Sequence, residues 1–291
     1  MWDYLADELE PQIRRGGFDA IIARGQDLAY VLTRPLPGLK ILDMANLLYL
    51  EAYYAWGANP AEVEETYEKE VLVWQSVDYI VSPHAVLTAY FVEHLARVGD
   101  FTRKTRTARL GCEPAPRVAR YSAAPRLVYA GSYYYIQDPY LLAQLAKLSP
   151  FPVDCYGPTD PNRKFLPAAL NYRGYEPGTG FLADYQVGLI TVSRDALRQH
   201  SPSTKFPYYF AHALPVLFPD WMLEGYEYRD CATPYNEHTF TKVLGAVAAE
   251  TKWRQMSEAA LSVASNLQWV NTLQPLQEII EDRGDATAII K

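Results

Sequence analysis

Short apolar runs alternate with longer amphipathic stretches along this chain, and no other sequence feature restricts the fold as much. In the first half, the runs FDAIIAR (18–24), GLKILDMA (38–45) and VDYIVSP (77–83) have the length and composition of buried strands. Residues 59–76 have helical periodicity, with Pro60 near the expected helix start. Because strand–helix–strand alternation produces right-handed crossovers, we expect an α/β protein with parallel sheets.

A second series of the same kind follows a join at 115–125, which is rich in proline and small residues. The first series also includes a helix at 84–99 and a short strand at 107–114. In the second series, strands are expected at 126–131, 151–157, 167–177, 187–192 and 214–219, and helices at 138–150, 205–213 and 239–267. Two consecutive series predict two Rossmann-like domains facing a cleft. The expected division is a short N-terminal domain at 1–120, a C-terminal domain at 121–270 and a tail at 271–291. Ligands of open parallel sheets bind beyond the carboxyl ends of the strands.

Composition excludes several classes of function. With 27 basic and 34 acidic residues the net charge is −7, so no general attraction to nucleic acid is expected. The three cysteines are widely spaced and form no C-x-x-C pair, which argues against a metal or redox site. The acidic N-terminus resembles no signal peptide, and no apolar run approaches the roughly 20 residues of a membrane span. The expected location is cytoplasmic.

One stretch favours binding of a diphosphate. Ser203 and Thr204 begin the helix expected at 205–213, and Lys205 adds a positive charge at a helix end that already favours anions. Gly131 and Ser132 close the strand at 126–131, where a glycine lets a ligand approach the backbone. The alternatives are a plain helix cap with a surface lysine, and an ordinary strand-to-helix turn.

Two residues are candidates for acid–base chemistry because each follows a predicted strand. Asp43 ends the strand in 38–45, where a carboxylate could deprotonate an acceptor hydroxyl, with Glu51 as the next candidate. His84 follows the strand in 77–83 and could contact phosphate or acceptor. The alternative for Asp43 is a helix cap, and for His84 a histidine at a helix start.

The segment SPSTKFPYYFAHALPVLF (201–218) resembles the S-x-x-K-x-x-E-Y-x-A-x-G-x-P-V signature of bacterial GT-B glycosyltransferases. Further resemblances follow in the family's order, and the pattern is closest to glucuronosyltransferase-like exopolysaccharide enzymes. The segments that carry them are RLGCEP (109–114), VYAGSY (128–133), LNYRGYEP (170–177) and VGLITVS (187–193), with Trp253, Met256, Ser257 and Trp269 in the closing helices.

The resemblance implies transfer of a sugar from a UDP- or GDP-linked donor to a glycan or lipid-linked acceptor. It places the nucleoside near Arg173, Tyr175, Glu176 and Tyr208, and the donor sugar near Glu224 and Gly225. No D-x-D pair is present, so a lysine in place of a metal is expected at the phosphates, with no cofactor. Peripheral contact with the inner face of the membrane, or with a partner chain, is compatible with this class.

The sequence departs from the family pattern both in the motif and in the N-terminal half. Tyr208 stands where the ribose-binding glutamate is usual, and Ala213 stands where a glycine is usual. The E-x7-E spacing of retaining members falls on His200 and Tyr208, so an inverting reaction with Asp43 as base is expected. The N-terminal half is short and lacks the glycine-rich opening of the acceptor domain. Two alternatives are a non-catalytic subunit that binds a nucleotide or a partner enzyme, and a sugar-nucleotide epimerase.

Overall fold

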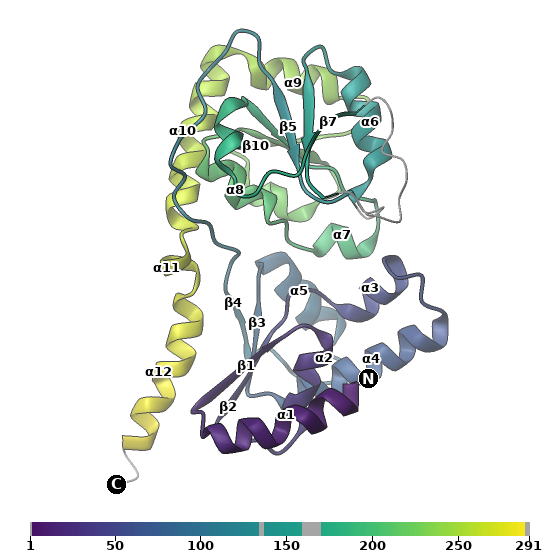
Figure 1. Cartoon of the computed structure of the whole chain (residues 1–291), viewed down its shortest axis with the longest axis vertical. Helices are drawn as coiled ribbons and strands as arrows, with labels where there is room; N and C mark the ends of the chain where they lie inside the picture. The colour runs from purple at the N-terminus through teal and green to yellow at the C-terminus, as the bar shows by residue number, and fades with distance from the viewer. Residues whose placement is uncertain (1, 134–136, 159–169, 289–291) are drawn as a thin grey trace. The chain divides into compact units, whose positions relative to one another are not determined.

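The computed structural model describes residues 2–133, 137–158 and 170–288, and the chain forms two compact units (Figure 1). The first unit comprises Met1–Arg109 and Thr272–Lys291, and the second comprises Leu110–Asn271. The division thus falls eleven residues before the expected boundary at 120, since 120 minus 109 is eleven. The segment expected to be a separate tail groups with the first unit.

A four-stranded parallel sheet organises the first unit, in the order β1-β2-β3-β4. Its strands are β1 (Ala20–Arg24), β2 (Leu39–Asp43), β3 (Tyr79–Ser82) and β4 (Thr105–Thr107). The other elements are α1 (Trp2–Gly16), α2 (Gln26–Ala29), η1 (Tyr30–Thr33), α3 (Leu48–Tyr54), α4 (Pro60–Ser76), α5 (Ala85–His94) and α12 (Gln274–Ala288).

Local sequence explains why α4 begins where it does. The Asn59 side chain accepts hydrogen bonds from the N–H groups of Ala61 and Glu62, and the Glu62 carboxylate accepts one from the Asn59 N–H, which completes a capping box. Pro60 occupies the first turn, where its missing N–H costs nothing. Farther along α4, the fully buried Trp74 makes an edge contact with Phe91 of α5, so the helix is anchored to the core.

The second unit contains a six-stranded parallel sheet in the order β10-β9-β8-β5-β6-β7. Its strands are β5 (Leu127–Ala130), β6 (Val153–Tyr156), β7 (Asn171–Gly174), β8 (Val187–Leu189), β9 (Val216–Pro219) and β10 (Ala232–Tyr235). The chain runs outward from β5 to β7 and then returns to place β8 on the other side of β5. The strand order therefore reverses between β5 and β8, and such switch points bind ligands in open α/β sheets.

Helices cover both faces of this sheet (Figure 1). On one face, α6 (Pro139–Leu148) and α9 (Phe240–Ala248) pack on alternate strand residues such as Leu127 and Val153. On the other face, α8 (Lys205–Ala211) and α10 (Glu250–Asn266) pack against Val128 and Val216. Burial on both faces explains why the strands were recognisable as apolar runs. The remaining elements are η3 (Gly180–Asp184), α7 (Ala196–His200), η4 (Leu223–Tyr228) and α11 (Trp269–Thr272).

Most expected strands and helices are present, and the exceptions have physical reasons. The strand expected at 107–114 was wrong, because β4 ends at Thr107. The helix expected at 239–267 is two helices, separated at Ala249, which has extended backbone. The join at 115–125 packs on the second unit, where the Ala119 N–H donates to the His212 carbonyl. In the part of the chain that the structure describes, no helix has the length and apolar character needed to cross a membrane.

Candidate functional site

A pocket of about 190 Å³ lies at the switch point of the second unit. Gln137 reaches it from the segment after β5, and Val192 from the segment after β8. The rest of its lining comes from α7, from the turn that leads into α8, from the start of α8 and from the residue before η4. These residues are Arg198, Ser201, Pro202, Ser203, Thr204, Lys205 and Met222. The pocket thus lies where the fold is expected to bind a ligand, and it contains three residues predicted for the diphosphate.

Lys205 and Arg198 bring positive charge to this pocket, and Lys205 begins the helix α8. The Lys205 ammonium group donates a hydrogen bond to Oε1 of Gln137 at 3.1 Å and lies 5.2 Å from the ring centre of Tyr129. Burial, together with the nearby positive charge of Arg198, lowers the pKa of Lys205 to about 7. Gln137 and Tyr129 are neutral, so no carboxylate in these contacts compensates the ammonium. An anion entering the pocket would meet a cation whose charge is poorly compensated.

Gly131 lies against the Lys205 side chain. A Cβ added at Gly131 would stand 2.7 Å from Cε and 2.9 Å from Nζ of Lys205, so a larger residue here would displace the lysine. Gly157 packs directly against the carbonyl of Gly131, because a Cβ added at Gly157 would stand 1.9 Å from the Gly131 oxygen. The structure thus brings Gly131 and Lys205 together, and their role in binding a diphosphate stays a prediction. The carbonyl of Ser132 accepts a hydrogen bond from the Tyr129 hydroxyl at 2.7 Å.

Glu224 holds the loop that carries Ser203. Its side chain is buried, and Oε2 accepts a hydrogen bond from the Ser203 N–H at 2.6 Å. The Ser203 hydroxyl in turn accepts one from the Lys205 N–H at 3.3 Å. Glu224 therefore fixes the turn that presents Lys205, although it does not line the pocket itself. Gly225 is required by packing, because a Cβ there would stand 2.3 Å from the Phe218 ring.

The four residues predicted for the nucleoside do not line the pocket around Lys205. Tyr175 and Tyr208 have rings that are 67% and 40% exposed, and Glu176 is also exposed. Arg173 is held elsewhere, since its Nε lies 3.2 Å from the buried carboxylate of Asp154.

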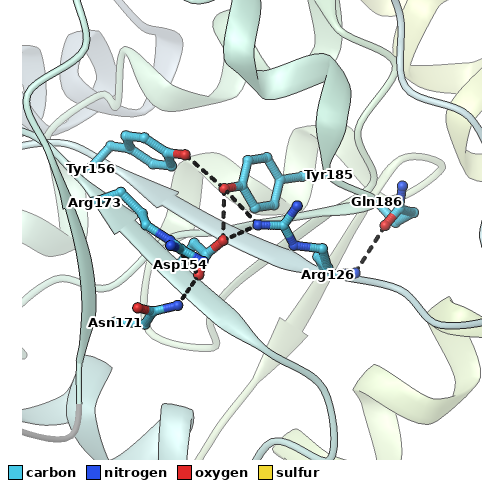
Figure 2. Close-up of polar contacts among 7 residues, drawn as sticks. All are labelled: Arg126, Asp154, Tyr156, Asn171, Arg173, Tyr185 and Gln186. Atoms are coloured by element: carbon cyan, nitrogen blue, oxygen red, sulfur yellow. Dashed lines mark hydrogen bonds and ion pairs between the residues drawn. The ribbon is translucent and has the colours of Figure 1, made fainter.

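Asp154 is the centre of a polar cluster that sequence reasoning missed (Figure 2). The carboxylate accepts hydrogen bonds from the Tyr185 hydroxyl at 2.8 Å, from Arg126 and from Asn171, in addition to the ion pair with Arg173. Burial alone would raise the pKa of Asp154, but the hydrogen bonds from Tyr185 and the two arginines outweigh it and lower the pKa. In the sequence, this cluster is indicated only by an aspartate, Asp154, inside the otherwise apolar run at 151–157.

Removing the Asp154 carboxylate is expected to destabilise the second unit. Asp154→Ala leaves the buried Tyr185 hydroxyl without its carboxylate acceptor, which costs about 1–3 kcal/mol, whereas Arg126 and Arg173 are nearly half exposed and can be solvated by water. The control is Asp184→Ala, whose pair with Arg117 is more than half exposed on both sides and is expected to contribute under about 1 kcal/mol. Urea unfolding of both variants measures the difference; equal losses would contradict the prediction.

The lowered pKa of Asp154 also means that the stabilisation by its carboxylate is complete above the ordinary aspartate pKa and is lost as the pH falls through the lowered value.

A second, smaller pocket lies beyond the carboxyl ends of β1 and β2 in the first unit, and Asp43 lines it. Asp43 is partly buried and lies 3.4 Å from Nη1 of Arg24. Burial raises the pKa of Asp43, and Arg24 partly opposes this shift. Asp43 does not cap α3. Glu70 has that role, because its two oxygens accept hydrogen bonds from the N–H groups of Leu48 and Tyr49, each at 2.9 Å.

Glu51 and His84 are engaged in local structure. The Glu51 carboxylate accepts a hydrogen bond from Asn46 at 2.6 Å. Nδ1 of His84 accepts one from the Val86 N–H at 3.1 Å, which caps α5, and the side chain is 1% exposed. These contacts match the alternative interpretation of His84, a histidine at a helix start.

Comparison with solved structures places this geometry in a known fold. The chain superposes on HepE of Anabaena, solved with UDP and glucose, with a TM-score of 0.73 at 11% identity, covering 95% of this chain and 81% of HepE. It superposes on TarM of S. aureus with a TM-score of 0.73 at 11% identity, covering 96% of this chain and 58% of TarM. This chain has the GT-B fold. Both parallel sheets are accounted for by that fold.

The GT-B match extends to the pneumococcal O-GlcNAc transferase GtfA, solved with UDP and GlcNAc, with a TM-score of 0.64 at 11% identity. That match covers 94% of this chain but 59% of GtfA, so the chain spans about 60% of the length of such relatives. No protein-family profile matches the chain, and no curated protein matches it by sequence. The fold was therefore recognisable from one short motif and its neighbours, although the identity to these solved structures is 11%.

Proposed function

We propose that this chain is a glycosyltransferase that takes a sugar from a nucleoside diphosphate and passes it to a glycan or lipid-linked acceptor. The observation that carries the proposal is the position of the Lys205 ammonium, in a pocket at the switch point of a GT-B fold. A diphosphate fits that position because it offers negative oxygens to a buried cation. The solved relatives that hold UDP support a UDP-linked donor, and a GDP-linked donor is the alternative.

Each residue of the proposed donor site has a defined task. Lys205 neutralises the charge that develops on the departing nucleoside diphosphate, which lowers the barrier to breaking the bond to the sugar. Gly131 leaves room for the lysine and for the phosphates. Ser203 and Glu224 hold the turn in place, and Gln137 orients the ammonium. With the lysine supplying positive charge, transfer is proposed to be metal-independent.

Asp43 is the proposed general base. Transfer to a hydroxyl needs a group that removes its proton as the new bond forms, and a carboxylate with a raised pKa is suited to that task. Asp43 lines a pocket at the carboxyl ends of its strands, which is where acceptors of α/β folds are expected. With one base and no nucleophile in this proposal, the anomeric configuration is inverted.

The nucleoside is proposed to contact the exposed rings of Tyr175 and Tyr208. An exposed tyrosine offers a flat face on which a base can stack, at a contribution of about 1–3 kcal/mol. Arg173 lies in β7 and Glu176 follows the strand beside Tyr175; Arg173 keeps its contact with Asp154 in this arrangement.

One observation favours a second candidate, a subunit that binds a nucleotide without turning it over. Tyr208 occupies the family's ribose-binding position and cannot accept hydrogen bonds from two ribose hydroxyls as a carboxylate does. Such a subunit would keep the pocket around Lys205, would bind a nucleotide and would release no product from a sugar nucleotide.

A ligand screen followed by a turnover assay separates these functions. Thermal unfolding is measured with UDP, GDP, TDP, CMP and ADP, and we expect UDP or GDP to raise the midpoint because only the folded chain binds it. Release of free nucleoside diphosphate from the matching sugar nucleotide then indicates an enzyme. Binding without release would favour the non-catalytic subunit. No shift with any nucleotide would overturn the proposed donor site.

A further inference from the structure

The strand β1 lies at an edge of the first unit's sheet and presents apolar side chains to solvent. Within the described residues it pairs only with β2. Ile22, in the middle of the strand, is 47% exposed. A free edge of this kind is a template on which another strand can add.

The other three sheet edges carry features that discourage such pairing. β10 contains Pro234, which lacks a backbone donor, and β7 carries Arg173 together with a register shift against β6. β4 carries Arg106, and α12 packs beside it. β1, with the sequence AIIAR, has no proline, and its only charge is at its last residue. Among the described edges, β1 alone is long, apolar and unprotected.

An apolar groove runs along this edge and has a volume of about 430 Å³. Phe18 and Leu28 flank Ile22 in it and are 54% and 49% exposed, while Leu9 and Ile13 of α1 form its wall. Exposure of several large apolar side chains around one free strand is typical of an interface.

The backbone of β1 is oriented for pairing. The Asp19 carbonyl accepts the Leu39 N–H from β2, so in an extended strand the odd-numbered residues direct their backbone groups toward β2. Ala20, Ile22 and Arg24 therefore direct their N–H and C=O groups away from β2. The same three residues provide the hydrogen-bonding edge and the exposed side chain of Ile22.

We propose that a second copy of this chain pairs with β1 in antiparallel orientation about a two-fold axis at Ile22. In this register Ile22 faces Ile22 of the other copy and Ala20 faces Arg24, so no like charges are opposed. Each Arg24 is then a diagonal neighbour of Phe18 across the pair, which places the charged residue over an aromatic ring. The dimer joins the two four-stranded sheets into one and covers both apolar grooves.

Light scattering after size-exclusion chromatography tests the oligomeric state across a range of protein concentrations. We expect the wild-type chain to be a dimer and Ile22→Lys to be a monomer, because the substitution places two lysines opposite each other at the axis. Leu72→Lys is the matched control: Leu72 lies on α4 of the same unit and has the same 47% exposure, and this variant should remain a dimer. A wild-type monomer at every concentration, or a dimeric Ile22→Lys, would overturn the proposal.

A cysteine substitution tests the register independently of any loss of stability. Opposed residues in the hydrogen-bonded position of an antiparallel pair have Cα atoms about 5.5 Å apart, within the range of a disulfide. Ile22→Cys should form a covalent dimer on mild oxidation, whereas Leu72→Cys should not. The three native cysteines are buried and should not interfere. Failure of Ile22→Cys to crosslink at concentrations where the wild-type chain is dimeric would exclude this register.

Discussion

Replacing Lys205 with methionine is expected to weaken binding of the sugar-nucleotide donor by about 10- to 100-fold. Hydrogen bonds to charged groups contribute about 1.5–3 kcal/mol, and 1.4 kcal/mol corresponds to a factor of ten in affinity. Methionine keeps most of the side-chain volume between Gly131 and Tyr129, so the change removes the charge while preserving the packing. Isothermal calorimetry with the sugar nucleotide that gives the largest thermal shift provides the measurement.

The ligand-free Lys205→Met variant should be at least as stable as the wild-type chain. Burial lowers the pKa of Lys205 to about 7, which means that the folded state holds the charged lysine at a cost. Removing that charge relieves the cost, so a loss of affinity cannot be ascribed to unfolding. Lys242→Ala, an exposed lysine on α9, is the control and should bind the donor as the wild-type chain does. Unchanged affinity in Lys205→Met would remove the basis of the donor site.

The lowered pKa of Lys205 also predicts how donor affinity depends on pH. Binding needs the protonated form, and a bound diphosphate raises the pKa of Lys205 from its lowered value of about 7. Affinity should therefore be constant well below this pH and fall as the pH rises above it, by up to about tenfold per unit. The sugar-linked diphosphate has no ionisation of its own in this range. Lys205→Met should show a flat profile.

Sequence reasoning predicted the strand and the helix that flank the candidate site, but not the strand order that brings them together. β5 and α8 were predicted as a strand and a helix; Gly131 follows β5, Lys205 begins α8, and the two residues lie against each other. The reversal of strand order between β5 and β8 depends on β8 returning past two strands, a long-range pairing that local patterns do not encode. The contact between the two residues was predicted only through the family resemblance.

Other features depend on side chains that meet only in the folded chain. Gln137 lies in a segment without periodicity, so nothing in the sequence pointed to its hydrogen bond with Lys205. Glu70 lies within the amphipathic helix α4 and resembles its many acidic neighbours, yet it alone caps α3. β10 was missed because Pro234 is unfavourable in most strands, although an edge strand tolerates it.

Replacing Asp43 with asparagine is expected to reduce sugar transfer by about 100- to 10,000-fold while leaving donor affinity unchanged. The amide keeps the size of the side chain but cannot accept the proton of the acceptor hydroxyl. The donor site is built from the second unit, so calorimetry should give the wild-type affinity. Asp100→Asn, an exposed aspartate of the same unit, is the control and should transfer normally. Wild-type turnover in Asp43→Asn would exclude Asp43 as the base.

The pH dependence of turnover distinguishes a base from a residue that merely supports the fold. Burial raises the pKa of Asp43 and Arg24 opposes that shift, so Arg24→Gln should raise the pKa further. The base must be deprotonated to act, and turnover is therefore lost as the pH falls through its pKa. The acidic limb of the rate profile should thus move to higher pH in Arg24→Gln, with the rate at high pH largely retained. A structural role for Asp43 would lower the rate at every pH and leave the limb in place.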